Sequence, residues 1–139
     1  MLICNAVLTD ADGARPGDVR IENGVITAVG EGLSAGGDTV LDAGGRTLLP
    51  AFIDLHCHFR TPGFEYKEDI DSGSRAAARG GYTFVNCIAN TRPVCSSAAI
   101  AQSIMDDARR IGLCDVNQCV SITKDFDGKT PPKRTTETE

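Results

Sequence analysis

Hydrophobic positions in the first 49 residues recur in short runs separated by turn residues. The β-type runs are residues 3–9, 18–21, 25–29, 39–41 and 47–49. Asn23-Gly24 stands between the second and third runs, and predicts a two-residue hairpin because a type I′ turn needs positive φ at both central positions. Residues 1–49 are therefore expected to form a small β segment.

From residue 50 onward the apolar pattern alternates between strand and helix periods. Strands are predicted at 51–58, 82–89 and 115–123. One helix is predicted over 68–79, followed by Gly80-Gly81, and a second begins at Ser96 or Ser97 and ends before Gly112. This order of strands and helices predicts an α/β unit with parallel, right-handed crossovers.

The strand at 51–58 carries the candidate chemistry. Side chains alternate between the two faces of a strand, which predicts one apolar face that packs against helices and one face with polar groups. The apolar set is Ile53, Leu55, Cys57 and Phe59, and the other set is Phe52, Asp54, His56 and His58. Two imidazoles at i and i+2 can bind one metal ion, although an H-x-H taken alone is also compatible with two incidental histidines.

Composition narrows the classes of function. The chain has 41% hydrophobic residues, a net charge of −5 and 14 scattered Lys and Arg residues, which argues against nucleic-acid binding. It has no apolar run near the roughly 20 residues of a membrane span and no signal-peptide pattern at its start, so a soluble, cytoplasmic protein without a membrane partner is expected. Six cysteines form no C-x-x-C pair, which favours buried free thiols.

Three stretches, 54–70, 73–78 and 90–93, strongly resemble the dihydroorotases, in the cyclic amidohydrolase branch of the amidohydrolase superfamily. The resemblance runs from about Met1 to Lys129 and covers the first third or so of a family member. It implies an incomplete (β/α)8 TIM barrel with its first three β/α units, preceded by part of a β-sandwich. The expected divisions are a β segment at 1–49, a partial TIM-barrel domain at 50–126 and a disordered tail at 127–139, which lacks apolar residues.

The resemblance also implies roles for individual residues. His56 and His58 would bind the more buried of two zinc ions, and Arg60 and Asn90 would hold a substrate carboxylate. Asp54 lies on the same predicted strand face as the histidines and is expected to orient one of them by a hydrogen bond, as carboxylates beside metal ligands often do. Alternatives that stay open are a surface ion pair of Arg60 with Glu65 or Glu68, a turn role for Asn90 and a satisfied buried acid at Asp54. Lys124, Asp125 and Asp127 are expected in a solvated loop without a ligand role. Asn86 and Phe84 depart from the family's usual second strand.

The implied activity is zinc-dependent hydrolysis of a cyclic amide, interconverting dihydroorotate and N-carbamoyl-aspartate in pyrimidine biosynthesis. The sequence has two histidines, whereas a catalytic zinc normally has three protein ligands, so a truncated chain without its own catalytic residues, inactive alone, is expected. An allantoinase or hydantoinase is the alternative in the same class. The other is a non-catalytic subunit that supports aspartate carbamoyltransferase. A homo-oligomer is also compatible with the resemblance.

Overall fold

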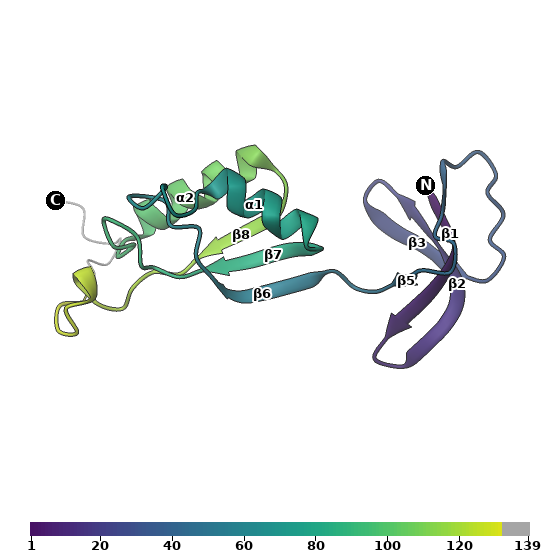
Figure 1. Ribbon diagram of the computed structural model, residues 1–139, viewed down its shortest axis with the longest axis horizontal. Coiled ribbons are helices and arrows are strands. Elements are labelled where there is room, and N and C mark those ends of the chain that lie inside the picture. The colour runs from purple at the N-terminus through teal and green to yellow at the C-terminus, as the bar shows by residue number, and fades with distance from the viewer. Residues whose placement is uncertain (132–139) are drawn as a thin grey trace. The chain divides into compact units, whose positions relative to one another are not determined.

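The computed structural model describes residues 1–131, and the chain divides into two compact units, Met1–Pro50 and the part from Ala51 onward. Each unit has its own sheet (Figure 1). No helix within residues 1–131 has both the length and the apolar composition of a membrane span.

The first unit is a five-stranded sheet. Its strands are β1 (Leu2–Asp10), β2 (Gly13–Glu22), β3 (Val25–Gly30), β4 (Val40–Asp42) and β5 (Thr47–Leu48). β1, β2 and β3 pair antiparallel, whereas β4 and β5 both pair with β1 in parallel. The predicted hairpin is confirmed, since Asn23 and Gly24 have φ of 50° and 78°. Ala6, Leu8 and Val19 form the small core of this unit.

The second unit confirms the predicted order of strand, helix, strand, helix and strand. Its elements are β6 (Phe52–Cys57), α1 (Ile70–Arg79), β7 (Tyr82–Cys87), α2 (Ala98–Ile111), β8 (Asp115–Gln118) and a 3-10 turn, η1 (Lys124–Phe126). The sheet order is β6-β7-β8, with both pairs parallel. Both helices lie on one face of this sheet (Figure 1). Within the described chain the sheet does not close, and no α-helix follows β8.

Local signals explain where the two helices begin. The carboxylate of Asp69 accepts a hydrogen bond from Ser72 N at 2.8 Å, and Ser72 Oγ accepts one from Asp69 N at 3.3 Å, which completes a capping box. Ser97 Oγ accepts from Ile100 N, so the second of the two predicted serines caps α2. Gly112, with φ of 68°, ends α2 in the left-handed conformation that glycine tolerates.

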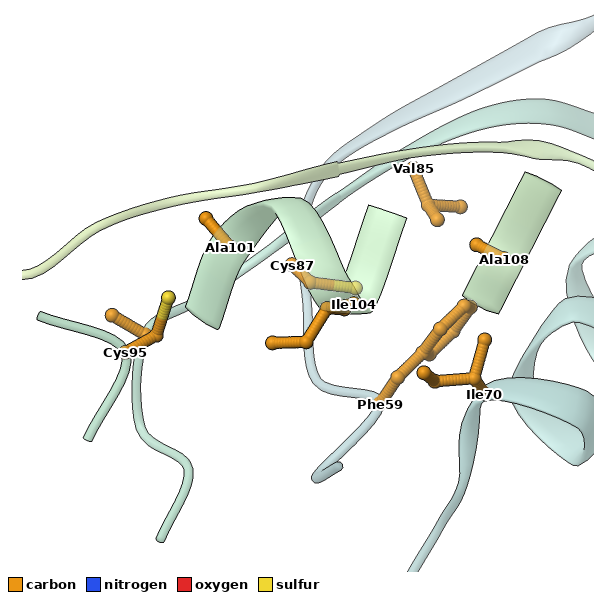
Figure 2. Close-up of a cluster of buried hydrophobic side chains, with 9 residues drawn as sticks. Phe59, Ile70, Val85, Cys87, Cys95, Ala101, Ile104 and Ala108 are labelled. Atoms are coloured by element: carbon orange, nitrogen blue, oxygen red, sulfur yellow. The ribbon is translucent and has the colours of Figure 1, made fainter. Parts of the chain in front are cut away.

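The core of the second unit lies between the sheet and the two helices (Figure 2). Val85 and Cys87 of β7 face Ile104 and Ala108 of α2, and Phe59 packs beside Ile70 (Figure 2). Every second side chain of β7 from Val85 onward is buried, as expected for a strand with one face covered by helices.

The predicted faces of β6 are wrong in their first half. Ile53 and Leu55 are 60% and 71% exposed, whereas Asp54 lines a cavity with Ala77 of α1. Phe59 is buried in the core, as predicted. The alternation therefore changes within the strand, because the pairing register between β6 and β7 shifts there.

The predicted disordered tail falls largely outside the described residues. Residues 127–131 form neither helix nor strand, and residues 132–139 lie outside the part that the structure describes.

Candidate metal and substrate site

The site is built at a β-bulge in β6. Asp54 pairs with Val85 and Cys57 pairs with Cys87, so the two residues 55–56 of β6 stand opposite the single residue between the β7 partners. An extra residue of this kind kinks a strand and re-aims its side chains. It accounts for the change of alternation, and both residues of the bulge, Leu55 and His56, are exposed.

The rings of His56, in the bulge, and of His58, just after β6, lie close together. The ring centroids of His56 and His58 are 5.2 Å apart, with the planes inclined at 73°. Two imidazoles that bind one zinc at about 2.1 Å with a tetrahedral angle have centroids about 5 Å apart. The spacing of these two rings is thus compatible with a shared metal ion.

The ring of His58 is held by a hydrogen bond to Asn90, in the loop after the neighbouring strand. Its Nδ1 lies 2.9 Å from Oδ1 of Asn90, which follows the end of β7. Because an amide oxygen only accepts hydrogen bonds, Nδ1 carries the proton in this arrangement. A neutral ring then has its lone pair on Nε2, the state in which imidazole binds a metal. The structure therefore brings together two residues that lie 32 positions apart.

Asp54 contacts the main chain of His56 and makes no hydrogen bond to either imidazole in the described chain. Its Oδ1 accepts from His56 N at 2.9 Å. The predicted orienting role of Asp54 stays a prediction, and the contact that would exert it is with the backbone.

Arg60 follows the strand with φ of 59°, in the left-handed region. Its guanidinium makes no hydrogen bond or ion pair with another residue of the part described. Glu65 accepts from Gly63 N at 2.8 Å, and Glu68 contacts Ser72 Oγ and Asp69 N. Neither acid pairs with Arg60, so the alternative of a surface ion pair with Glu65 or Glu68 is not supported within residues 1–131.

The loops that carry Arg60 and Asn90 are tied together. Arg92 N donates to Pro62 O at 2.8 Å. Gly63 has φ of 94°, and a Cβ added there would stand 2.1 Å from Arg92 O. Only a residue without a side chain permits this approach of the two loops.

The residues present fit part of a zinc site. Among residues 1–131, no group of three or more His, Cys, Asp or Glu side chains is placed to hold a metal ion. His56 and His58 supply two nitrogen donors of the type that zinc prefers, whereas a catalytic zinc normally has three protein ligands. Asp127 accepts hydrogen bonds from Lys129 N and Thr130 N in the loop after β8 and is exposed, in accord with a loop role.

The six cysteines are free thiols, as predicted, but the predicted burial holds for only two of them. Cys87 and Cys95 are buried and the other four are half-buried. Cys57 Sγ lies 3.4 Å from Cys87 Sγ, on paired strands. The hydrogen bond with Cys57, together with burial, raises the pKa of the Cys87 thiol, so Cys87 stays protonated near neutral pH.

Asn86 is a residue whose contacts the sequence did not predict. Its side chain contacts both neighbouring strands of the sheet: Nδ2 lies 3.1 Å from Leu55 O and 3.1 Å from Cys119 Sγ, and Oδ1 accepts from Asn117 Nδ2 at 2.6 Å. The sequence feature that could have indicated these contacts is an amide side chain in the middle of a strand, because a half-buried amide needs hydrogen-bond partners.

Comparison with known proteins agrees with this architecture. The sequence pattern of the family described as Dihydro-orotase-like matches residues 45–129. The chain belongs to this family. It is 46% identical over 130 residues to a dihydroorotase of Clostridium botulinum, covering 94% of this chain and 33% of that protein. It is 47% identical over 113 residues to a dihydroorotase of Trichlorobacter lovleyi, covering 80% of this chain and 26% of that protein.

A similar fold is found in a solved structure, the L-hydantoinase (dihydropyrimidinase) from Arthrobacter aurescens. The TM-score is 0.74 at 21% identity, covering 88% of this chain and 28% of the hydantoinase. The chain thus spans about a third or less of the length of the proteins it matches, with the folded elements of a cyclic amidohydrolase.

Proposed function

We propose that this chain provides the first metal ligands and the carboxylate-binding residues of a zinc-dependent dihydroorotase, which interconverts dihydroorotate and N-carbamoyl-aspartate in pyrimidine synthesis. The observation that carries the proposal is the pair of imidazoles, 5.2 Å apart, with His58 Nδ1 held by Asn90. The 46% identity to a dihydroorotase supports the choice of reaction.

Each residue then has a separate task. His56 and His58 present neutral ring nitrogens to the metal. When bound, zinc supplies Lewis-acid activation of water and of the amide carbonyl. Asn90 uses its oxygen to fix the tautomer of His58, and its Nδ2, which has no hydrogen-bond partner within residues 1–131, can donate to a substrate oxygen.

Arg60 selects the substrate. A guanidinium offers a planar fork that matches a carboxylate with two parallel hydrogen bonds. Because neither Glu65 nor Glu68 pairs with Arg60, its charge remains available for an anionic ligand. Dihydroorotate carries such a carboxylate, whereas the simplest neutral ring amides do not.

Two other functions are compatible with parts of this picture. A hydantoinase-type enzyme would share this fold, since the TM-score to the Arthrobacter aurescens protein is 0.74, but identity of 21% supports the fold alone. A non-catalytic subunit that supports aspartate carbamoyltransferase would need the fold but not the imidazole pair. Retention of both histidines with ligand-like spacing favours the catalytic role.

A chimera tests the proposal. This chain replaces the matching first third of the Clostridium botulinum dihydroorotase, and hydrolysis of dihydroorotate and of dihydrouracil is measured at equal zinc content. We expect turnover of dihydroorotate that a His56→Ala variant loses. Faster hydrolysis of dihydrouracil would favour a hydantoinase-type function. A folded, zinc-loaded chimera whose turnover of dihydroorotate does not exceed that of its His56→Ala variant would refute the catalytic proposal.

A further inference from the structure

The bulge in β6 exposes main-chain groups that the ladder to β7 no longer pairs regularly. Bulges leave the extra residue unpaired and disrupt hydrogen bonding locally. At this bulge two side chains make the compensating bonds. Asp54 Oδ1 accepts a hydrogen bond from His56 N at 2.9 Å, and Asn86 Nδ2 donates one to Leu55 O at 3.1 Å.

The identity of the Asn86 atoms follows from their partners. Leu55 O is a carbonyl and can only accept, so the atom facing it is the amide nitrogen. The oxygen of Asn86 then faces Asn117 Nδ2, which donates at 2.6 Å. The second proton of Nδ2 points to Cys119 Sγ at 3.1 Å. With all three polar positions engaged, the Asn86 side chain is held in one orientation.

We infer that Asn86 is a positioning residue for the metal-ligand pair, because its amide holds the bulge that turns His56 toward His58. Leu55 O and His56 N belong to the same peptide unit, which is held at its oxygen by Asn86 and at its nitrogen by Asp54. Fixing both ends of this peptide fixes the direction in which the His56 side chain leaves the strand. The inference rests on the proposed function only for the identity of the ligand.

The expected size of the effect follows from the solvent exposure of these bonds. Removing a residue that orients a metal ligand typically lowers metal affinity about 10- to 100-fold. The bond from Asn86 to Leu55 O is accessible to solvent, so water can partly replace it, and a loss near tenfold is expected.

The test uses the 139-residue protein and zinc alone. Zinc affinity is measured by following the ring protons of His56 and His58 by NMR in four proteins: the unchanged chain, Asn86→Ala, Asn86→Asp and Asn117→Ala. We expect about tenfold weaker binding in Asn86→Ala, a smaller loss in Asn86→Asp, and a change of less than about twofold in Asn117→Ala, which removes an amide from the same face but leaves the bond to Leu55 O.

Asn86→Asp separates positioning from electrostatics. It keeps the size of the side chain, loses the donor to Leu55 O and adds a negative charge on the same face. The charge alone would strengthen zinc binding. A fall in affinity in both variants supports the inference, whereas unchanged or tighter binding in Asn86→Ala would overturn it. Thermal unfolding is measured alongside, and Asn86→Ala carries the test if Asn86→Asp fails to fold.

A second readout needs no metal. Rings 5.2 Å apart give a proton–proton NOE, which we expect to be present in the unchanged chain and in Asn117→Ala, and weakened in Asn86→Ala. If zinc binding proves insensitive to His56→Ala, the proposed metal role fails while this NOE still decides the positioning role. An unchanged NOE in Asn86→Ala would then overturn the inference.

Discussion

Gly73 of α1 leaves the space that the ring of Phe59 occupies. A Cβ added at Gly73 would stand 2.4 Å from Cδ1 and 2.5 Å from Cε1 of that ring, inside van der Waals contact. Phe59 lies between His58 and Arg60 in sequence and is buried in the core under the helices (Figure 2). The contact therefore fixes the backbone that carries a candidate metal ligand and the candidate carboxylate-binding residue.

Gly73→Ala is expected to destabilise the chain by about 1–3 kcal/mol, because overpacking a core forces side chains off their preferred rotamers. Intrinsic helix propensity predicts the opposite sign, since alanine is favoured over glycine by about 1 kcal/mol within a helix. Urea unfolding of the two proteins decides between the two signs.

Ala76→Gly is the matched control on the exposed part of the same helix. Helix propensity alone predicts a loss of about 0.5–1 kcal/mol there. A Gly73→Ala protein that is more stable than the unchanged chain would mean that Phe59 relaxes without cost.

Arg60→Lys in the chimera is expected to lower kcat/KM for dihydroorotate roughly tenfold to a hundredfold. Charge-assisted hydrogen bonds contribute about 1.5–3 kcal/mol each, and an ammonium cannot reproduce the two parallel bonds of the guanidinium. Zinc content should not change. Steady-state kinetics with dihydroorotate and with dihydrouracil measure the effect.

The loss should be confined to the substrate that carries a carboxylate. Kinetics on dihydroorotate close to those of the unchanged chimera would remove Arg60 from the site, since exposed ion pairs contribute only about 0–1 kcal/mol and tolerate Lys in place of Arg.

The 139-residue polypeptide is expected to bind zinc weakly and through its histidines. Two imidazoles without further ligands should fall well short of a closed structural site, whose binding free energy is about 10 kcal/mol or more. Calorimetry on reduced protein measures the affinity, which His56→Ala or His58→Ala should abolish. Tight one-to-one binding that survives both substitutions would instead point to the cysteine thiols.

The same polypeptide is expected to show no dihydroorotase turnover by itself. Two protein ligands do not complete the set of three that holds a catalytic zinc. Purified protein with added zinc is assayed in both reaction directions, beside His56→Ala as the background. Activity clearly above that background would show that the chain assembles the remaining ligands in another way, for example from a second copy.

The cap of α1 predicts a pH dependence. Hydrogen bonds from the backbone and side chain of Ser72 lower the pKa of Asp69. A carboxyl with a lowered folded-state pKa contributes stability above its unfolded pKa of about 3.9, and loses that contribution as the pH falls through the folded value. The stability difference between the unchanged chain and Asp69→Asn should therefore be constant above about pH 5 and shrink below about pH 4.

Urea unfolding at a series of pH values measures this difference. Because asparagine also caps helices well, the substitution removes the charge while keeping the cap. A difference that does not vary with pH would mean that the Asp69 carboxylate has no titrating role in the cap.

Much of the local structure follows from short-range patterns. The Asn23-Gly24 turn, the Ser97 cap and the Gly112 end of α2 each depend on the conformation of a few neighbouring residues, and sequence predicts such features well. The parallel strand order also follows from the spacing of strands and helices. The i, i+2 spacing also indicated that the rings of His56 and His58 lie close together. The faces predicted for the residues before His56 were wrong.

The faces of β6 depend on information that strand periodicity does not contain. Alternation predicts that Asp54 and His56 share a face, but the extra residue at 55–56 interrupts it. The bulge is made possible by Asn86, 31 positions from Leu55, whose amide satisfies a carbonyl of the neighbouring strand. The side chain that bonds to the bulge thus comes from another strand, and no pattern within residues 50–60 indicates it.

The bulge also affects how β6 meets other chains. β6 is the edge strand of its sheet in the part of the chain that the structure describes, and its outer rim offers unpaired backbone groups. A straight incoming strand needs an unbroken two-residue repeat to dock along such a rim, and a bulge breaks that repeat. The kink that gathers the two imidazoles thus makes the same edge a poor template for amyloid-like stacking, despite the exposed Ile53 and Leu55.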